Sequence, residues 1–247
     1  MLRFALRAAK PDHLPQLACR TRVNSNMPRF YSIRDNSFYT RGFPWICSLP
    51  QGLGVTYQCK TEGRTLLYAT GKMVALLERD KGVKWPDVLG CGAFPFLIVS
   101  ERVKDAWDRE GVGAFPMEQI EIAAPLPKKL VGTVPPGYFW IDGARLRGAL
   151  TDFEASGFVD VHFCPECGTR TDNITETSMR RFAQGARWPY VFREDTWNGL
   201  NLFTTDISDC KFFCTEAVVE CARKYKLTNF RFIPIEDGDD VRSRVLK

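Results

Sequence analysis

Two stretches of the chain repeat one pattern of apolar and polar positions, the first starting at Leu97 and the second 115 residues later at Phe212. Each begins with an apolar run typical of a buried strand. Each continues with apolar residues at i, i+3 and i+4, which is the stripe of an amphipathic helix. The stripe residues are Val103, Ala106 and Trp107, and then Val218, Cys221 and Ala222. The pattern predicts two related strand–helix–strand units at about 96–122 and 211–236.

The register between these stretches predicts roles for single residues. Ser100 and Thr215 directly precede the two helices, where a hydroxyl oxygen can accept a hydrogen bond from a free helix N–H group. An acidic residue follows each of them, which favours the positive end of a helix. Cys214 and Cys221 fall where the first stretch has apolar residues. We therefore expect both cysteines in the core rather than as ligands or nucleophiles.

The remaining pattern completes an α+β fold, in which the two units pack with a mixed β-sheet. We expect one α+β domain over residues 27–247, with internally similar halves at 27–136 and 137–247. The other expected elements are short strands within 28–60, a strand at 64–68, a helix at 73–79, a loop or helical turn at 85–89, strands at 137–141 and 159–163, and a helix at 177–184.

Residues 1–26 differ in composition from the rest of the chain. They contain five basic residues and a single acidic one, Asp12, and they include two prolines. We interpret them as a disordered extension or as a start upstream of the true initiator, Met27. A targeting peptide is the alternative, because mitochondrial presequences are rich in arginine and poor in acids.

Charge and hydropathy limit the choice of partners. The chain has a net charge of +5, of which this first segment supplies +4 and residues 27–247 only +1. A nucleic-acid-binding domain usually has a basic patch, so a nucleic-acid partner is not expected. No apolar run reaches the roughly 18 residues of a membrane-spanning helix, so a membrane partner is not expected either.

The cysteines include one spaced pair. The chain has 9 cysteines, and an odd number without a secretion signal favours a reducing compartment, here the cytoplasm. Residues 164–168 read CPECG. Two residues between Cys164 and Cys167 let both thiolates reach one ion, and Gly168 permits the tight turn this requires. The segment predicts a zinc-knuckle-like turn with Cys164 and Cys167 as metal ligands.

A structural zinc site needs four ligands, and the chain has no second CxxC pair. Cys47 begins a segment, CSLP, that looks like half of one. Cys59 and Cys91 are further candidates, and His162 would share a strand face with Cys164. A CPECG turn without metal is the alternative that the sequence leaves open.

Candidate catalytic residues are few. The only histidines are His13 and His162, so a thiol-dependent enzyme would have to combine Cys164 with His162. No nucleophile elbow, phosphate-binding loop, dinucleotide fingerprint or HExxH motif is present. We therefore expect no catalytic residues. A group of acids toward the C-terminus suits a basic protein partner, or a solvated tail: Asp206, Asp209, Glu236, Asp237, Asp239 and Asp240.

Several segments together resemble a known family. They are CPECG at 164–168, Asn201–Phe203, the run from Phe213–Glu216 to Phe230–Phe232, and Arg29–Tyr31 near the start. They are similar to the double-CXXCG motif immunity proteins of the swarming-inhibition toxin–immunity systems described in myxobacteria. The resemblance implies a protein that binds and neutralises a cognate toxin by stoichiometric inhibition inside the producing cell.

The chain departs from that family in one place. The family carries two CXXCG motifs, and here the first is degenerate, at best Cys47 with the SLP that follows it. Only Cys164 and Cys167 carry over as possible zinc ligands, and no toxin-contact residue does. The competing hypotheses are a zinc-knuckle nucleic-acid-binding protein and the thiol enzyme that would use Cys164 and His162.

Overall fold

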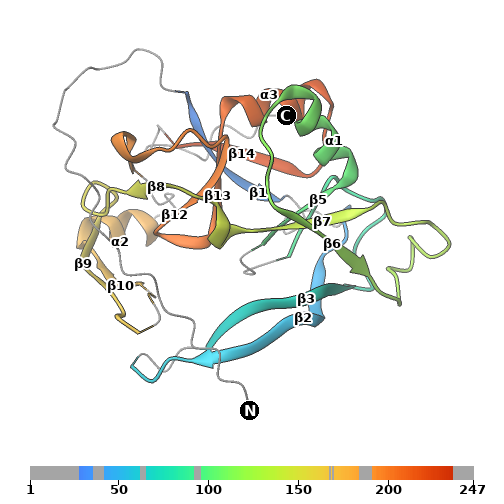
Figure 1. The fold of residues 1–247 in the computed structure, drawn as a ribbon, viewed down its shortest axis with the longest axis horizontal. Coiled ribbons are helices and arrows are strands. Elements are labelled where there is room, and N and C mark those ends of the chain that lie inside the picture. Colours follow the sequence, from blue (N-terminus) through green and yellow to red (C-terminus); the bar gives the residue numbers. More distant parts are fainter. Residues whose placement is uncertain are drawn as a thin grey trace.

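The computed structural model describes residues 28–35, 42–61, 65–91, 96–166, 168, 170–183 and 191–235. The fold is a mixed α+β arrangement in which strands predominate (Figure 1). Residues 1–26, Cys167 and the acids at 236–240 lie outside the described residues. No helix in the described ranges combines the length and the apolar character needed to cross a membrane.

The first sheet has six strands in the order β2-β3-β6-β7-β5-β4. Helix α1 (Glu101–Glu110) connects β5 to β6, and among the described strand pairs of this sheet only β3–β6 is parallel. The strands are β2 (Ile46–Gln58), β3 (Thr65–Leu77), β4 (Val88–Leu89), β5 (Phe96–Ser100), β6 (Met117–Ile122) and β7 (Tyr138–Asp142).

The second sheet has six strands in the order β11-β8-β12-β13-β1-β14, and helix α3 (Glu216–Lys224) connects β13 to β14. A separate hairpin, β9 (Phe158–Phe163) with β10 (Arg170–Ile174), precedes α2 (Glu176–Ala183). The strands of the second sheet are β1 (Phe30–Asp35), β8 (Arg147–Thr151), β11 (Phe192–Arg193), β12 (Leu202–Thr205), β13 (Ser208–Thr215) and β14 (Phe230–Pro234).

Both sheets contain the same arrangement around their helix. Strand β7 lies between β5 and β6 and is antiparallel to both, and β1 lies in the same way between β13 and β14. Ser100 at the end of β5 pairs with Tyr138, and Thr215 at the end of β13 pairs with Phe30. The central strand follows β6 in the first sheet but comes from the start of the chain in the second. A division at residue 136 therefore does not separate the two sheets.

The two residues before the helices do not cap them with their side chains. Ser100 and Thr215 stand at the N-cap positions, but neither hydroxyl bonds a helix N–H group. Instead, the Ser100 hydroxyl donates to Asp87 Oδ1 at 3.0 Å, and the Thr215 hydroxyl donates to Asn201 Oδ1 at 2.7 Å. The expected side-chain cap was wrong because a strand neighbour supplies a strong acceptor for each hydroxyl.

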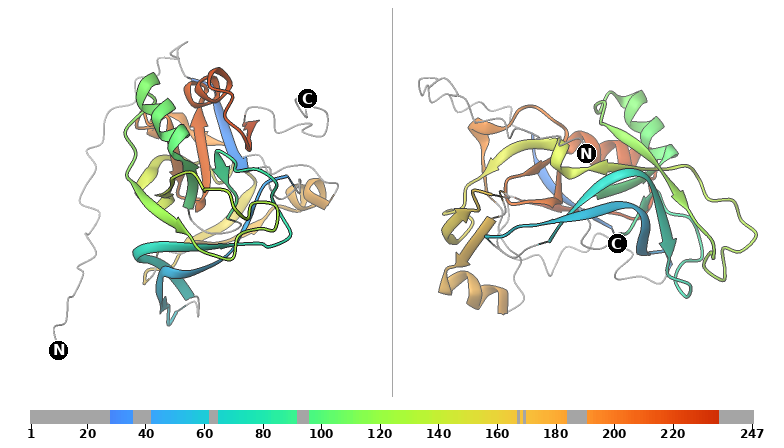
Figure 2. Two further views of the ribbon diagram at one scale, coloured as in Figure 1. Left: turned by 90° about the vertical axis from the view of Figure 1, so that its right-hand side faces the viewer. Right: turned by 60° about the horizontal axis from the view of Figure 1, so that its bottom comes forward.

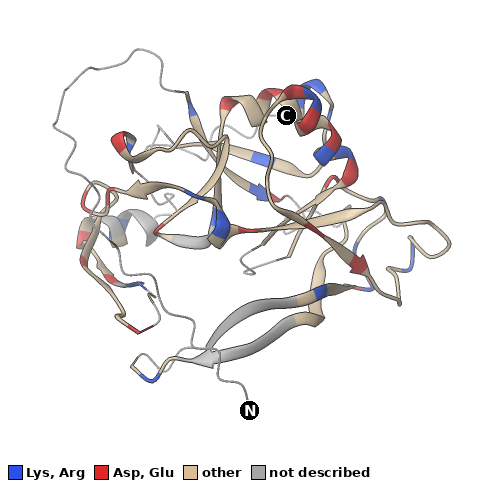
Figure 3. Ribbon diagram, viewed as in Figure 1, with Lys and Arg blue, Asp and Glu red and all other residues tan. Residues whose placement is uncertain are grey.

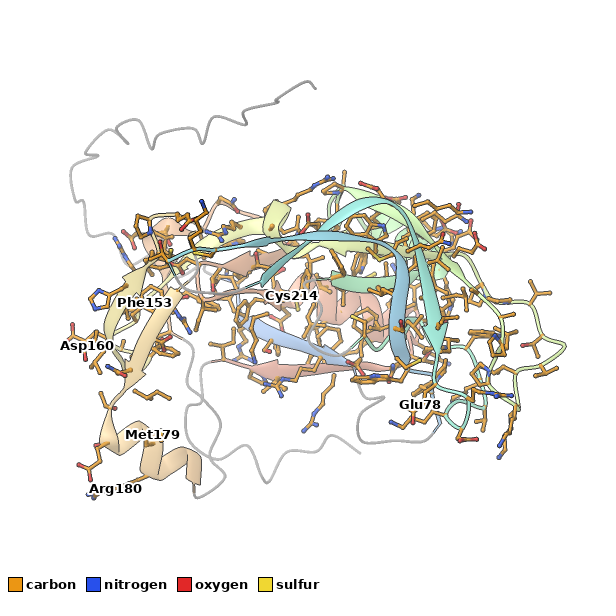
Figure 4. The ribbon with its side chains drawn as sticks, turned by 90° about the horizontal axis from the view of Figure 1, so that it is seen from below. Glu78, Phe153, Asp160, Met179, Arg180 and Cys214 are labelled. Carbon is orange, nitrogen blue, oxygen red and sulfur yellow. The ribbon has the colours of Figure 1, made fainter. Side chains whose placement is uncertain are left out.

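Helices α1 and α3 lie side by side over one shared core (Figures 1 and 2). Cys214 and Cys221 are both buried in it, which confirms their predicted core positions. Burial raises the pKa of the Cys214 thiol well above its usual range, and burial is also the main cause of the raised pKa of Cys221. Figure 4 shows Cys214 deep between the layers. A buried thiol with a raised pKa is a poor nucleophile.

The helix expected at 73–79 is absent, because β3 continues to Leu77 and a turn follows it. Met73 and Ala75 are fully buried and pair with Ile120 and Ile122 of β6, while the same stretch of β3 also pairs with β2. Pairing on both edges satisfies the backbone N–H and C=O groups that a helix would have satisfied internally. The loop or helical turn expected at 85–89 likewise ends in a short strand, β4.

Candidate functional site

The CPECG turn, residues 164–168, follows directly after β9. The backbone N–H of Gly168 donates to the carbonyl oxygen of Cys164 at 2.8 Å, which closes the segment into a turn. Gly168 has a φ of +67°, a left-handed conformation that glycine adopts at little cost. Cys167, the second expected ligand, lies outside the described residues.

Cys59 meets this turn from a distant part of the chain. It follows the last residue of β2, and its Sγ lies 3.6 Å from the Sγ of Cys164, across a sequence separation of 105 residues. Cys59 is 0% and Cys164 5% exposed. A disulfide would bring the sulfurs to about 2.05 Å, so these are two separate thiols in contact.

Glu166 joins the two turns through its carboxylate. Its Oε2 accepts hydrogen bonds from the backbone N–H of Thr61 at 3.1 Å and from the Thr61 hydroxyl at 2.8 Å. Its Oε1 accepts from the backbone N–H of Lys60 at 3.3 Å, and Oε2 also lies 3.5 Å from the Cys59 sulfur. The carboxylate therefore holds the segment Cys59–Thr61, here called the Cys59 turn, against the CPECG turn.

The sulfur pair fits part of a zinc site. Tetrahedral zinc with Zn–S bonds of about 2.3 Å places two thiolate sulfurs about 3.8 Å apart. The separation of 3.6 Å between Cys59 and Cys164 is close to that edge of the tetrahedron. Among the described residues, no group of three or more His, Cys, Asp or Glu side chains converges as a metal site. The described residues would thus supply two of the four ligands of a tetrahedral zinc site.

The other cysteines named from the sequence lie elsewhere. Cys47 is exposed and donates to the carbonyl of Leu76, and Cys91 is buried and donates to the carbonyl of Phe96. The structure therefore places Cys59, rather than Cys47 or Cys91, beside Cys164. The sequence does contain a signal for this pairing: Cys59 begins CKTEG, which repeats the Cys-to-Gly spacing of CPECG with a glutamate at the second cysteine position.

His162 and Cys164 do not share a face. Strand β9 ends at Phe163, so the alternation of sides stops before Cys164, and the expected common orientation was wrong. The His162 side chain is exposed, whereas Cys164 is buried. Among the described residues, no hydrogen bond joins the His162 ring to the Cys164 thiol. The structure does not bring together the pair that a thiol enzyme would need.

Acidic and basic side chains are interspersed on the surface. Both signs occur along α1 and α3, as Figure 3 shows for the part of the chain that the structure describes. Asp206 accepts a hydrogen bond from the backbone N–H of Thr151 at 2.8 Å, so its carboxylate has a structural partner. The acids at 236–240 are outside the described residues, and their proposed role in steering a basic partner stays a prediction.

Comparison of the chain with models of known protein families and with curated proteins found no match.

Proposed function

We propose that this chain is a cytoplasmic immunity protein that binds a cognate toxin and inhibits it stoichiometrically. The carrying observation is the location of the segments that resemble the double-CXXCG immunity proteins. Apart from CPECG, they form adjacent strands of one sheet in the order β12-β13-β1-β14. These segments are Asn201–Phe203, Phe213–Glu216, Arg29–Tyr31 and Phe230–Phe232. Because these segments are far apart in sequence yet adjacent in one sheet, their location supports a resemblance in fold to the double-CXXCG immunity proteins.

The two strand–helix–strand segments are, in this proposal, related units. The strand pairing supports this relation, because β7 and β1 each lie antiparallel to the strand before the helix and to the strand after it. So do the hydrogen bonds at the helix starts, where the N–H of Glu101 bonds the Gly137 carbonyl at 2.7 Å and the N–H of Glu216 bonds the Arg29 carbonyl at 3.0 Å. A duplicated scaffold is suited to presenting a surface to another polypeptide.

The proposed contact surface lies at the end of the molecule formed by β8, β9 and α2 (Figure 1). Large apolar side chains are exposed there, and interfaces are rich in such methionine and aromatic residues. Phe163 is 47% and Met179 51% exposed. Figure 4 shows Met179 and Arg180 projecting from α2, away from the sheets. The exposed apolar residues of this region are Leu150, Val159, Phe163, Met179 and Val191.

Co-expression with the toxin encoded beside its gene tests the proposal. We expect the wild-type chain to restore growth and to co-purify with the toxin in a 1:1 complex. Phe163→Ser should weaken both effects, whereas Val134→Ser, a still more exposed apolar site in the loop before β7, should not. Failure of the folded wild-type chain to rescue cells or to bind the toxin would rule the proposal out.

A further inference from the structure

We propose that Cys59 and Cys164 are ligands of one zinc ion, which clamps the β2–β3 hairpin to the β9–β10 hairpin. This inference stands independently of toxin binding. It assigns a metal-binding role to Cys59 and removes Cys47 from the site. The location of the two turns, the chemistry of the side chains between them and the sequence of both turns support this site.

The two turns come from different parts of the fold. Strand β2 belongs to the first six-stranded sheet, and β9 belongs to the separate two-stranded hairpin. The β2–β3 hairpin extends as a long curved ribbon toward β9 and β10 (Figure 2). Where they meet, the Cys59–Cys164 contact and the hydrogen bonds of Glu166 join the turns. A metal ion bound by both sulfurs would cross-link the two hairpins at this point through metal–sulfur bonds.

Buried thiols in contact are suited to a cation. Zinc displaces one proton from each thiol and forms two Zn–S bonds, and the two released protons balance the two charges of the ion. Glu166, held by the N–H groups of Lys60 and Thr61, supplies a further negative charge beside Cys59.

The sequences of the two turns also match. Cys59 and Cys164 each begin a five-residue segment that ends in glycine, and each follows directly on the last residue of a strand. Structural zinc sites are commonly built from two such turns that face each other. Cys167, the ligand expected from the sequence, follows Cys164 by three residues. The clamp therefore draws on both turns rather than on the CPECG turn alone.

Metal analysis of the full chain, purified without a histidine tag, is the first test. We expect about one zinc per wild-type chain, and less than about one fifth of that in Cys59→Ser and in Cys164→Ser, because loss of a ligand weakens a site strongly. Cys47→Ser is the matched control, since Cys47 is exposed and lies outside the sulfur pair. It should keep its zinc.

Spectroscopy and stability provide readouts that a general packing defect would not reproduce. Cobalt-substituted wild type and Cys47→Ser should show the same thiolate-to-cobalt absorption, and Cys59→Ser should lose most of it. A chelator should lower the Tm of the wild type and of Cys47→Ser, but not that of Cys59→Ser. If Cys59→Ser does not fold, Cys59→His decides the matter, because an imidazole can replace the thiolate as a ligand and should retain zinc.

Three results would overturn the clamp. The first is a folded wild-type chain without zinc that binds none when zinc is added. The second is a folded Cys59→Ser variant that keeps its zinc and still loses Tm with a chelator, or a folded Cys59→His variant that binds no zinc. The third is an intact mass showing a Cys59–Cys164 disulfide in protein prepared under reducing conditions. None of these results depends on the toxin, so the clamp and the immunity proposal can fail separately.

Discussion

The residue directly before α1 and the residue directly before α3 both donate a hydroxyl hydrogen bond, but to acceptors of different charge. Asp87 precedes β4 and Asn201 precedes β12, and each accepts a hydrogen bond from the hydroxyl before the helix. The Asp87 carboxylate also accepts from Arg102 at 2.9 Å and from the Thr228 N–H at 2.6 Å. The amide of Asn201 instead donates to the Val112 carbonyl at 2.7 Å. The buried Asp87 carboxylate requires several hydrogen-bond donors, whereas the neutral Asn201 amide needs one donor for its oxygen and one acceptor for its nitrogen.

The same two side chains also connect the surroundings of the two helices. Asp87, which contacts the residue before α1, accepts hydrogen bonds from Thr228 in the loop after α3. Asn201, which contacts the residue before α3, donates to Val112 in the loop after α1. The contacts are reciprocal, and they fix how α1 and α3 lie side by side. The contact between the two helices and their loops therefore depends on two polar side chains as well as on apolar packing.

The largest effect should come from the packing difference between the helices. Trp107 is fully buried in α1, and the equivalent position in α3 is Ala222. Trp107→Ala should lower the free energy of unfolding by about 3–5 kcal/mol, because it leaves a large cavity between the helices. Urea denaturation measures this. Trp107→Phe is the control and should cost much less, since the indole N–H has no hydrogen-bond partner among the described residues to lose. A loss below about 1 kcal/mol for Trp107→Ala would contradict a shared core.

Exchanging the side chains at Asn201 and Asp87 should lower the free energy of unfolding less than Trp107→Ala does. Asn201→Asp places a carboxylate against the Val112 carbonyl, with no donor to offer, and should destabilise the protein by about 3 kcal/mol near neutral pH. Protonation restores a donor, so the pKa of the introduced carboxyl should be raised in the folded state. The penalty is then present above that pKa and shrinks as the pH falls through it. A stability difference from wild type that does not shrink in acid would speak against this geometry.

The opposite exchange should have a smaller effect. Asp87→Asn removes the charge that faces Arg102 and presents an amide group where Thr228 donates, so we expect a loss of about 2 kcal/mol. Arg102→Gln is the matched control, with a loss below about 1 kcal/mol, because the Arg102 side chain is 53% exposed. Equal losses for both variants would show that the ion pair, rather than the buried acceptor, matters at this position.

The smallest effect should come from the exposed link between the helix ends. The ammonium of Lys224 and the hydroxyl of Tyr225 donate to Glu110, and the bond from Lys224 is the main cause of the lowered pKa of that carboxyl. A lowered carboxyl pKa adds stability above the unfolded value, and this stability is lost as the pH falls through the folded value. Glu110→Gln should therefore differ slightly from wild type at neutral pH and not in strong acid, as thermal melts at both pH values can measure. Salt should also reduce the difference. A difference that persists in acid and high salt would exclude the ion pair as its cause.

Of the two turns in the proposed metal site, only the CPECG turn could be predicted from the sequence. The CPECG spacing indicates a turn by itself, since chain geometry over five residues determines which groups meet. The signal in the partner turn is weaker, because CKTEG keeps the first cysteine and the glycine of CPECG but not the second cysteine, and it did not single out Cys59 over Cys47 or Cys91. The structure brings Cys59 to Cys164 because β2 is long enough to carry it there, and that length results from pairing with β3.

Local periodicity by itself located α1, α3 and β6, and the core positions of Cys214 and Cys221, because a helix stripe or an alternating strand is a property of neighbouring residues. Only the tertiary structure decided that β1 joins the second sheet and β7 the first, and that residues 73–77 form a strand. It also decided that Ser100 and Thr215 bond strand neighbours instead of helix N–H groups. Each of these outcomes depends on partners distant in sequence, whose hydrogen bonds and buried area outweigh local preference.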